Sequence, residues 1–100
     1  MGVNMKMIQH MQTRLETMQR ELADTVVEGT AGGGIVTAQV TGAREFRGIS
    51  IDPSAVDPDD VEMLEDLITV AIQDAMNRAN ALAEEKMGAV TGGLRIPGLM

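Results

Sequence analysis

The sequence predicts an α+β fold in which a helix, a three-stranded antiparallel β-meander and a long second helix follow one another (α-β-β-β-α). Apolar residues recur every three to four positions near the N-terminus, which indicates the first helix. Short β-rich segments punctuated by glycines come next, and a second run with helical spacing fills most of the remainder. With 100 residues, the chain has the length of one small domain.

Residues 5–24 are expected to form the first helix. Neither glycine nor proline interrupts this segment, and its apolar side chains are spaced three or four residues apart, as on one face of an amphipathic helix. These side chains are Ile8, Met11, Leu15, Met18 and Leu22. We expect the stripe to be buried, with Met11 and Met18 as flexible core filling rather than the lining of a ligand groove.

The meander is expected from three segments rich in β-forming residues: 26–27, 35–41 and 46–51. In the middle segment Val36, Ala38 and Val40 alternate with polar residues, as in a half-buried strand. The connections "TAGGG" and "TGAR" are short enough for antiparallel hairpins. The third strand should end at Pro53, because proline cannot donate to the ladder.

Three consecutive glycines, Gly32 to Gly34, fit either a tight turn or a phosphate-binding loop. A phosphate loop needs its glycines between a strand and the N-terminus of a helix, where backbone amides converge on the anion. Here a strand-like segment follows, and no Gly-Lys-Ser/Thr comes after it. The context therefore predicts a hairpin turn with positive φ angles.

The second helix is expected to start in "DPDDVEML", with Asp57 as N-cap and Pro58 at the first helical position. Apolar residues continue at helical spacing as far as Met87, and Gly88 is a candidate C-cap. A helix of about 30 residues is roughly 45 Å long, more than so small a domain can cover. Part of its apolar face should therefore meet a partner.

The composition also favours an oligomer. A chain this short buries only about 60 to 70% of its unfolded surface, and Phe46 is the single aromatic residue. We expect one dimerising domain over residues 1–88 and a flexible, glycine-rich tail over residues 89–100. Since the N-terminal segment has no continuous apolar stretch, we expect neither a signal peptide nor membrane association. The absence of cysteine fits a reducing cytoplasm.

Nothing in the sequence favours an enzyme, a cofactor or a small-molecule substrate. His10 has no serine or aspartate at a suggestive spacing and is expected to be a surface residue. Five acidic residues have side chains that hard cations prefer: Asp52, Asp57, Asp59, Asp60 and Glu62. Their spacing lacks the central glycine and distant glutamate of an EF-hand loop, so we expect no metal site. A metal-dependent enzyme stays an alternative that metal analysis would test.

Several segments of the sequence resemble the YbaB/EbfC family of bacterial nucleoid-associated proteins. They are "VEGTAGGGIVTAQVTG", "ISIDPSAV" and "DDVEMLEDLITVAIQDAMNRANALAEEKM", and the resemblance covers roughly residues 5–88. It implies an intertwined homodimer with a shared β core and projecting helices that binds double-stranded DNA in the cytoplasm, at the nucleoid. It implies no enzymatic activity.

For the dimer core we expect eight apolar residues of the strands and the second helix: Val36, Val40, Ile49, Ile51, Leu64, Leu67, Ile68 and Ala71. For DNA contacts we expect the basic residues Lys6, His10, Arg14, Arg20, Arg44, Arg47, Arg78 and Lys86. Each arginine could instead pair with a nearby acid, as Arg20 could with Glu16. Because neither base-stacking aromatics nor an Arg- and Asn-rich recognition helix is present, binding should be mostly to the DNA backbone, with low sequence specificity.

The charge distribution leaves a competing hypothesis open. The chain carries a net charge of −7, with eight acids and no base between residues 52 and 74. Such a chain would be repelled from DNA unless a separate basic stripe makes the contact. The alternative is a dimeric adaptor with little or no DNA affinity, in which the acidic helix and an apolar tail bind protein partners in DNA metabolism. The tail residues are Leu94, Ile96, Leu99 and Met100.

Overall fold

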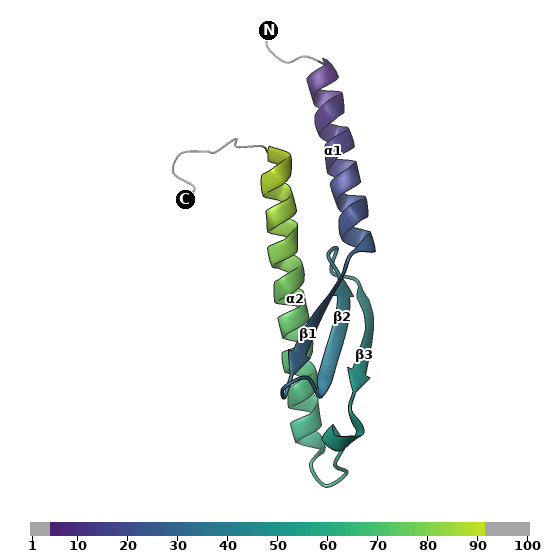
Figure 1. The fold of residues 1–100 in the computed structure, drawn as a ribbon, viewed down its shortest axis with the longest axis vertical. Helices are drawn as coiled ribbons and strands as arrows, with labels where there is room; N and C mark the ends of the chain where they lie inside the picture. The colour runs from purple at the N-terminus through teal and green to yellow at the C-terminus, as the bar shows by residue number, and fades with distance from the viewer. Residues whose placement is uncertain (1–4, 92–100) are drawn as a thin grey trace, which may run out of the picture.

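The computed structural model describes residues 5–91 and has the predicted α-β-β-β-α order (Figure 1). Its elements are α1 (Met5–Asp24), β1 (Val26–Ala31), β2 (Val36–Thr41), β3 (Phe46–Ile51), a short 3-10 turn (Pro53–Ala55) and α2 (Val61–Thr91). The three strands form one antiparallel sheet in the order β1-β2-β3. The molecule is elongated, measuring 69 × 29 × 16 Å.

The first hairpin confirms the turn interpretation of the glycine run. Gly32, Gly33 and Gly34 have φ angles of 62°, 75° and 101°, a region that side chains with a Cβ rarely adopt. The Gly34 amide donates to the Ala31 carbonyl at 3.2 Å and closes the turn. The glycines therefore serve the chain reversal that lets β1 pair with β2 over their full length.

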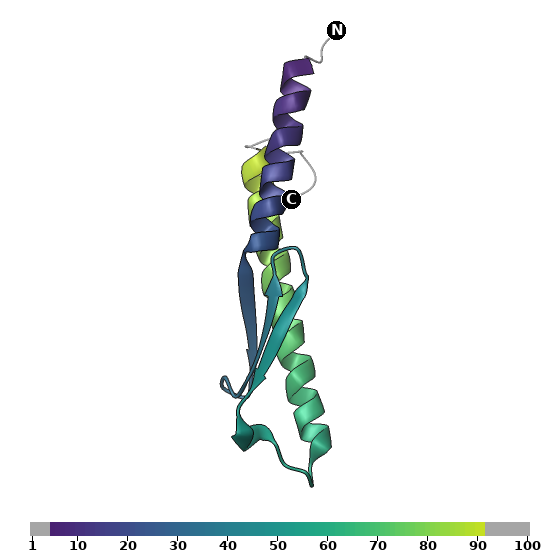
Figure 2. The same ribbon diagram turned by 90° about the vertical axis from the view of Figure 1, so that its right-hand side faces the viewer.

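One face of the sheet packs against α2, as Figure 2 shows from the side. Along β2, Val36, Ala38 and Val40 are fully buried and point toward the helix, as the alternation predicts. Small residues on α2 meet them at intervals of four: Ala71, Ala75 and Ala79. At Gly29 the two layers are in direct contact, because a Cβ there would lie 2.0 Å from the Ala75 nitrogen.

The helix covers β1 and β2 but hardly touches β3. Antiparallel partners share a face, so the register Val36↔Ile51, Ala38↔Ile49 and Val40↔Phe46 places three apolar side chains of β3 on the α2 side of the sheet. Phe46 is 56% exposed and Ile49 38% exposed, because none of the elements between residues 5 and 91 lies over them. The opposite face of the sheet is mostly polar and suits contact with water.

The start of α2 differs from the prediction. Asp57 is not its N-cap: the Asp57 carboxylate accepts the Asp59 amide at 2.9 Å, and Pro58 lies in that turn. The helix begins three residues later, where the Asp60 carboxylate accepts the Met63 amide at 3.2 Å. At the other end, α2 continues through Gly88 to Thr91, so Gly88 is not a C-cap. The remainder of the predicted tail, residues 92–100, lies outside the described residues.

Candidate nucleic-acid interface

The two helices run antiparallel at the end of the molecule away from the acidic turn (Figures 1 and 2). Only Met18 and Leu22 of the predicted α1 stripe are buried, against α2 and the β2–β3 turn. Ile8 and Met11 are 37% and 47% exposed, so the expected burial of Met11 is wrong for the single chain. The physical reason is that α2 packs along the part of α1 near the sheet, and the N-terminal half of α1 projects past it.

A groove of about 280 Å³ separates α1 from the end of α2. Arg14, Thr17 and Glu21 line it from α1, and Lys86 lines it from α2. The Lys86 Nζ lies 3.1 Å from Glu21 Oε2 and forms an ion pair that joins the two helices. Two of the predicted DNA-contacting residues, Arg14 and Lys86, therefore come together although 72 positions separate them in the sequence.

The outer turns of α1 carry a second small polar surface. Lys6, Gln9, His10 and Thr13 line a shallow depression there. The Thr13 hydroxyl donates to the Gln9 carbonyl within the helix at 2.9 Å. This surface and the α1–α2 groove both lie at the end of the molecule formed by α1 and the last turns of α2, which we call the helical end. The end formed by the sheet, the 3-10 turn and the start of α2 is the sheet end. Four of the predicted DNA contacts therefore lie at the helical end: Lys6, His10, Arg14 and Lys86.

The remaining arginines differ in how they are held. Arg20 and Arg47 are exposed, and neither forms a side-chain hydrogen bond or ion pair with any residue that the structure describes. The alternative pairing of Arg20 with Glu16 does not occur between 5 and 91. Arg44 has a φ of 67° in the β2–β3 turn, and its Nη1 donates to Asn80 Oδ1 at 3.0 Å. Arg44 thus ties this turn to α2.

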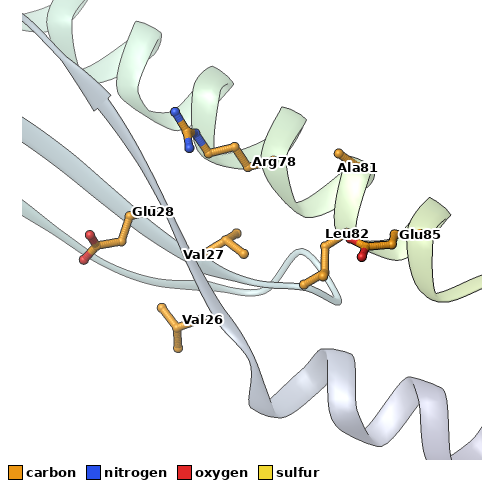
Figure 3. A pocket seen from close by; sticks show the side chains of 7 residues that line it. All are labelled: Val26, Val27, Glu28, Arg78, Ala81, Leu82 and Glu85. Carbon is orange, nitrogen blue, oxygen red and sulfur yellow. The ribbon is translucent and has the colours of Figure 1, made fainter.

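Arg78 lies beside β1, away from the α1–α2 groove. Its Nε is 3.3 Å from Asp74 Oδ2, which also accepts the Thr30 amide at 3.0 Å. The Thr30 hydrogen bond, and then the Arg78 charge, hold the pKa of Asp74 below its usual value of 3.8. Figure 3 shows Arg78 and Leu82 on the helix side of an open groove and Val27 pointing toward them from β1. Asp74 therefore satisfies an outward amide of an edge strand, and Arg78 supports it.

The predicted dimer-core residues fall into two groups. Val36, Val40 and Ala71 are at most 1% exposed and lie in the core of the chain itself. The others are partly exposed and border the uncovered part of the sheet or flank α2: Ile49, Ile51, Leu64, Leu67 and Ile68. The most exposed apolar side chain of β3 is Phe46, which was not among the residues predicted for the dimer core. The sequence did offer a signal for Phe46, because it is the single aromatic residue and stands at the start of an expected strand.

Seven of the fifteen acidic residues lie between Asp52 and Asp66, around the 3-10 turn and the start of α2 at the sheet end. Three of them serve the backbone: Asp57 and Asp60 as described above, and Asp52, whose carboxylate accepts the Ser54 amide at 2.9 Å. That hydrogen bond lowers the pKa of Asp52. Within residues 5–91 no group of three or more His, Cys, Asp or Glu side chains is arranged to hold a metal ion.

Across the described part of the chain, none of the helices combines the length and apolar character needed to cross a bilayer.

Comparison with known proteins adds family and fold. A model of the YbaB/EbfC DNA-binding family matches residues 1–94. A nucleoid-associated protein of Chloroflexus aurantiacus is 56% identical over 91 residues, covering 91% of each chain. One of Saccharopolyspora erythraea is 49% identical and covers 95% of this chain and 90% of its own. A crystal structure of an uncharacterised Helicobacter pylori protein shares the fold, with a TM-score of 0.76 at 20% identity over 87% of this chain and 91% of that one.

Proposed function

The chain belongs to the YbaB/EbfC DNA-binding family, and we propose that it is a nucleoid-associated protein of the cytoplasm that binds double-stranded DNA as a homodimer, mainly through backbone contacts with low sequence specificity. The observation that carries this proposal is the separation of charge along the molecule. Four bases of α1 and the end of α2 lie at the helical end among five acids, whereas residues 52–66 at the sheet end carry seven acids and no base. The proposed function involves neither cofactor nor small-molecule substrate.

The uncovered part of the sheet supports the homodimer. Phe46, Ile49 and Ile51 lie on the α2 side of the sheet, where α2 does not reach. Covering one such side chain fully contributes about 1.5 to 3 kcal/mol. A second copy seated there would bury these residues together with the flank of α2 that carries Leu64, Leu67 and Ile68. The polar opposite face of the sheet offers no comparable gain.

The basic surface of α1 supports backbone binding to a duplex. Lys6 and Arg20 are separated by about 21 Å along a helix, at 1.5 Å per residue, which spans several phosphates. The single aromatic side chain, Phe46, lies in the sheet and not at the helical end, so the α1 surface offers no platform for base stacking. Contacts of this kind fix position on the duplex without reading bases.

The distance between the two ends makes DNA binding compatible with the net charge of −7. The molecule is 69 Å long, whereas charges in physiological salt are screened beyond about 8 Å. The basic side chains at the helical end can therefore contact phosphates without repulsion from the acids of the sheet end, which lie several screening lengths away.

The test is a titration of labelled random-sequence duplex at several salt concentrations. We expect the logarithm of the binding constant to fall linearly with the logarithm of salt concentration. The variant Lys6→Gln with Arg14→Gln should weaken binding by about tenfold and lower this slope, because two phosphate contacts are lost per chain. A matched control, Gln73→Glu with Asn77→Glu, makes the same change in net charge on exposed positions of α2 and should change binding less. Equal effects from both variants would mean that α1 is not the contact surface.

A second candidate function is the protein adaptor. The observation that favours it is a set of exposed apolar side chains among the acids of α2: Val61, Met63 and Val70. If an intact dimer does not bind duplex at low salt, the DNA-binding function is wrong and the adaptor function remains.

A further inference from the structure

Three charged side chains line the groove between α1 and α2: two cations from different helices and one acid. Arg14 comes from α1, Lys86 comes from α2, and Glu21 is the acid. Resting on the function proposed above, we propose that the Glu21 carboxylate occupies the place of a DNA phosphate, and that Lys86 and Arg14 exchange it for a backbone phosphate when the duplex binds. Glu21 is then a built-in competitor of DNA.

The chemistry of the groove fits this exchange. A carboxylate and a phosphate both present anionic oxygens, and a lysine ammonium accepts either as a point charge. Arg14 forms no side-chain hydrogen bond or ion pair with residues 5–91, so its guanidinium can take a second oxygen of the same phosphate. The groove encloses about 280 Å³, against about 30 Å³ for one water molecule. It therefore has room for a phosphate group beside the carboxylate.

The ion pair is weak enough to be exchanged. The Lys86 and Glu21 side chains are 35% and 53% exposed, and pairs that are this open to water change an equilibrium by less than about fivefold. A phosphate on a duplex has an advantage that the carboxylate lacks, because binding it releases counterions condensed on the DNA. In the free protein, the pair holds the Lys86 side chain across the groove, aimed at α1. The lysine is thereby kept near the position where a phosphate would be met.

The exchange has a consequence for the shape of the interface. Because Lys86 belongs to α2 and Arg14 to α1, the duplex contacts both helices and holds them together. Without the Glu21 carboxylate the groove would carry one negative charge fewer per chain, and binding would be tighter. Glu21 therefore weakens the affinity of the wild-type protein.

The experiment compares three single variants and one double variant in the duplex titration. Glu21→Gln keeps the shape of the side chain and removes its charge, and we expect binding to be between about twofold and fivefold tighter than wild type. Glu16→Gln is the matched control: it removes an equal charge from the same helix, but Glu16 forms no ion pair within the part of the chain that the structure describes. We expect Glu16→Gln to tighten binding by less than about twofold.

The double variant tests whether Glu21 acts through Lys86. In a Lys86→Gln background, we expect Glu21→Gln to have no more effect than Glu16→Gln. Thermal unfolding followed by circular dichroism shows whether each variant keeps the fold. If the pair only positions α1 on α2, Glu21→Gln would lower the unfolding temperature and weaken binding, and the proposal would be wrong.

The outcomes separate this proposal from the one that it rests on. Suppose that wild type binds duplex, but that Glu21→Gln binds no more tightly than wild type or than Glu16→Gln. The groove proposal is then wrong, and the proposal of DNA binding stands. If the effect of Glu21→Gln persists at full size without Lys86, the groove proposal is also wrong. If none of the proteins binds duplex at low salt, both proposals are wrong.

Discussion

The two ends of this molecule are held together in different ways. At the sheet end, α2 lies so close to β1 that Gly29 meets the helix backbone, and ten apolar residues of the described chain are buried, mostly there. At the helical end, α1 meets α2 through Met18, Leu22 and one exposed ion pair. Stability therefore depends mainly on the sheet end, and the helical end is left with exposed polar and charged surface. We therefore expect changes at the sheet end to alter folding or assembly, and changes at the helical end to alter DNA binding.

Among changes at the sheet end, we expect the largest loss of stability from Gly29→Ala. The new Cβ would lie 2.0 Å from the Ala75 nitrogen and 2.3 Å from the Ala71 carbonyl oxygen, which are backbone atoms that cannot rotate away. The helix would have to move off β1, and we expect the free energy of unfolding to fall by about 3 kcal/mol or more. Urea unfolding measures this change. Gly48→Ala is the control, since its Cβ would approach nothing closer than 4.0 Å.

A smaller effect is expected at the uncovered part of the sheet. Phe46→Ala removes a side chain that is 56% exposed in the single chain, so it should cost the isolated fold little but weaken the dimer by about 1 to 3 kcal/mol. The dissociation constant from sedimentation equilibrium measures the effect. Val26→Ala is the matched control, because Val26 is 49% exposed and points to the opposite face. Dimer affinity that changes equally in both variants would place the interface elsewhere.

Asp74→Asn should have the smallest effect and a characteristic pH dependence. The pKa of Asp74 is lowered in the folded protein, chiefly by the Thr30 amide, so its charged form contributes stability above the unfolded pKa of 3.8. That contribution is lost as pH falls through the lower, folded pKa. We therefore expect the variant to be less stable than wild type at neutral pH.

Below the unfolded pKa of 3.8 the deficit of Asp74→Asn should shrink and then vanish. Urea unfolding at a series of pH values measures it. Asp66→Asn is the control, since no hydrogen bond to its carboxylate occurs among residues 5–91. A deficit that stays constant into acid would mean that the Thr30 contact does not depend on the carboxylate charge.

Much of the fold could be predicted because local patterns and tertiary packing agree. The alternation of Val36, Ala38 and Val40, the positive φ of the glycine turn and the helical spacing of both helices are all local signals. The start of α2 was less predictable. Asp57, Asp59 and Asp60 are all good caps by type, and only the folded turn selects Asp60.

The site was less predictable than the fold for a similar reason. Sequence spacing places Lys6, Arg14 and Arg20 on α1, but the encounter of Arg14 with Lys86 depends on how α2 packs. Arg44 has a side-chain partner that no local pattern indicated, Asn80. The pair of Arg78 with Asp74, by contrast, has the i,i+4 spacing that is typical of ion pairs on a helix. Likewise, the exposure of Phe46 follows from the width of the sheet relative to one helix, which depends on the whole fold.

The most direct test of the separation between the two ends is sedimentation of the protein with labelled duplex at about 50 mM and about 500 mM salt. We predict a mass of twice the chain mass of 10.7 kDa for the free protein at both salts, with DNA bound only at the lower salt. This result would mean that apolar contacts hold the dimer and charges hold the DNA. A well-folded single chain in dilute solution, or DNA binding that does not change with salt, would contradict the account.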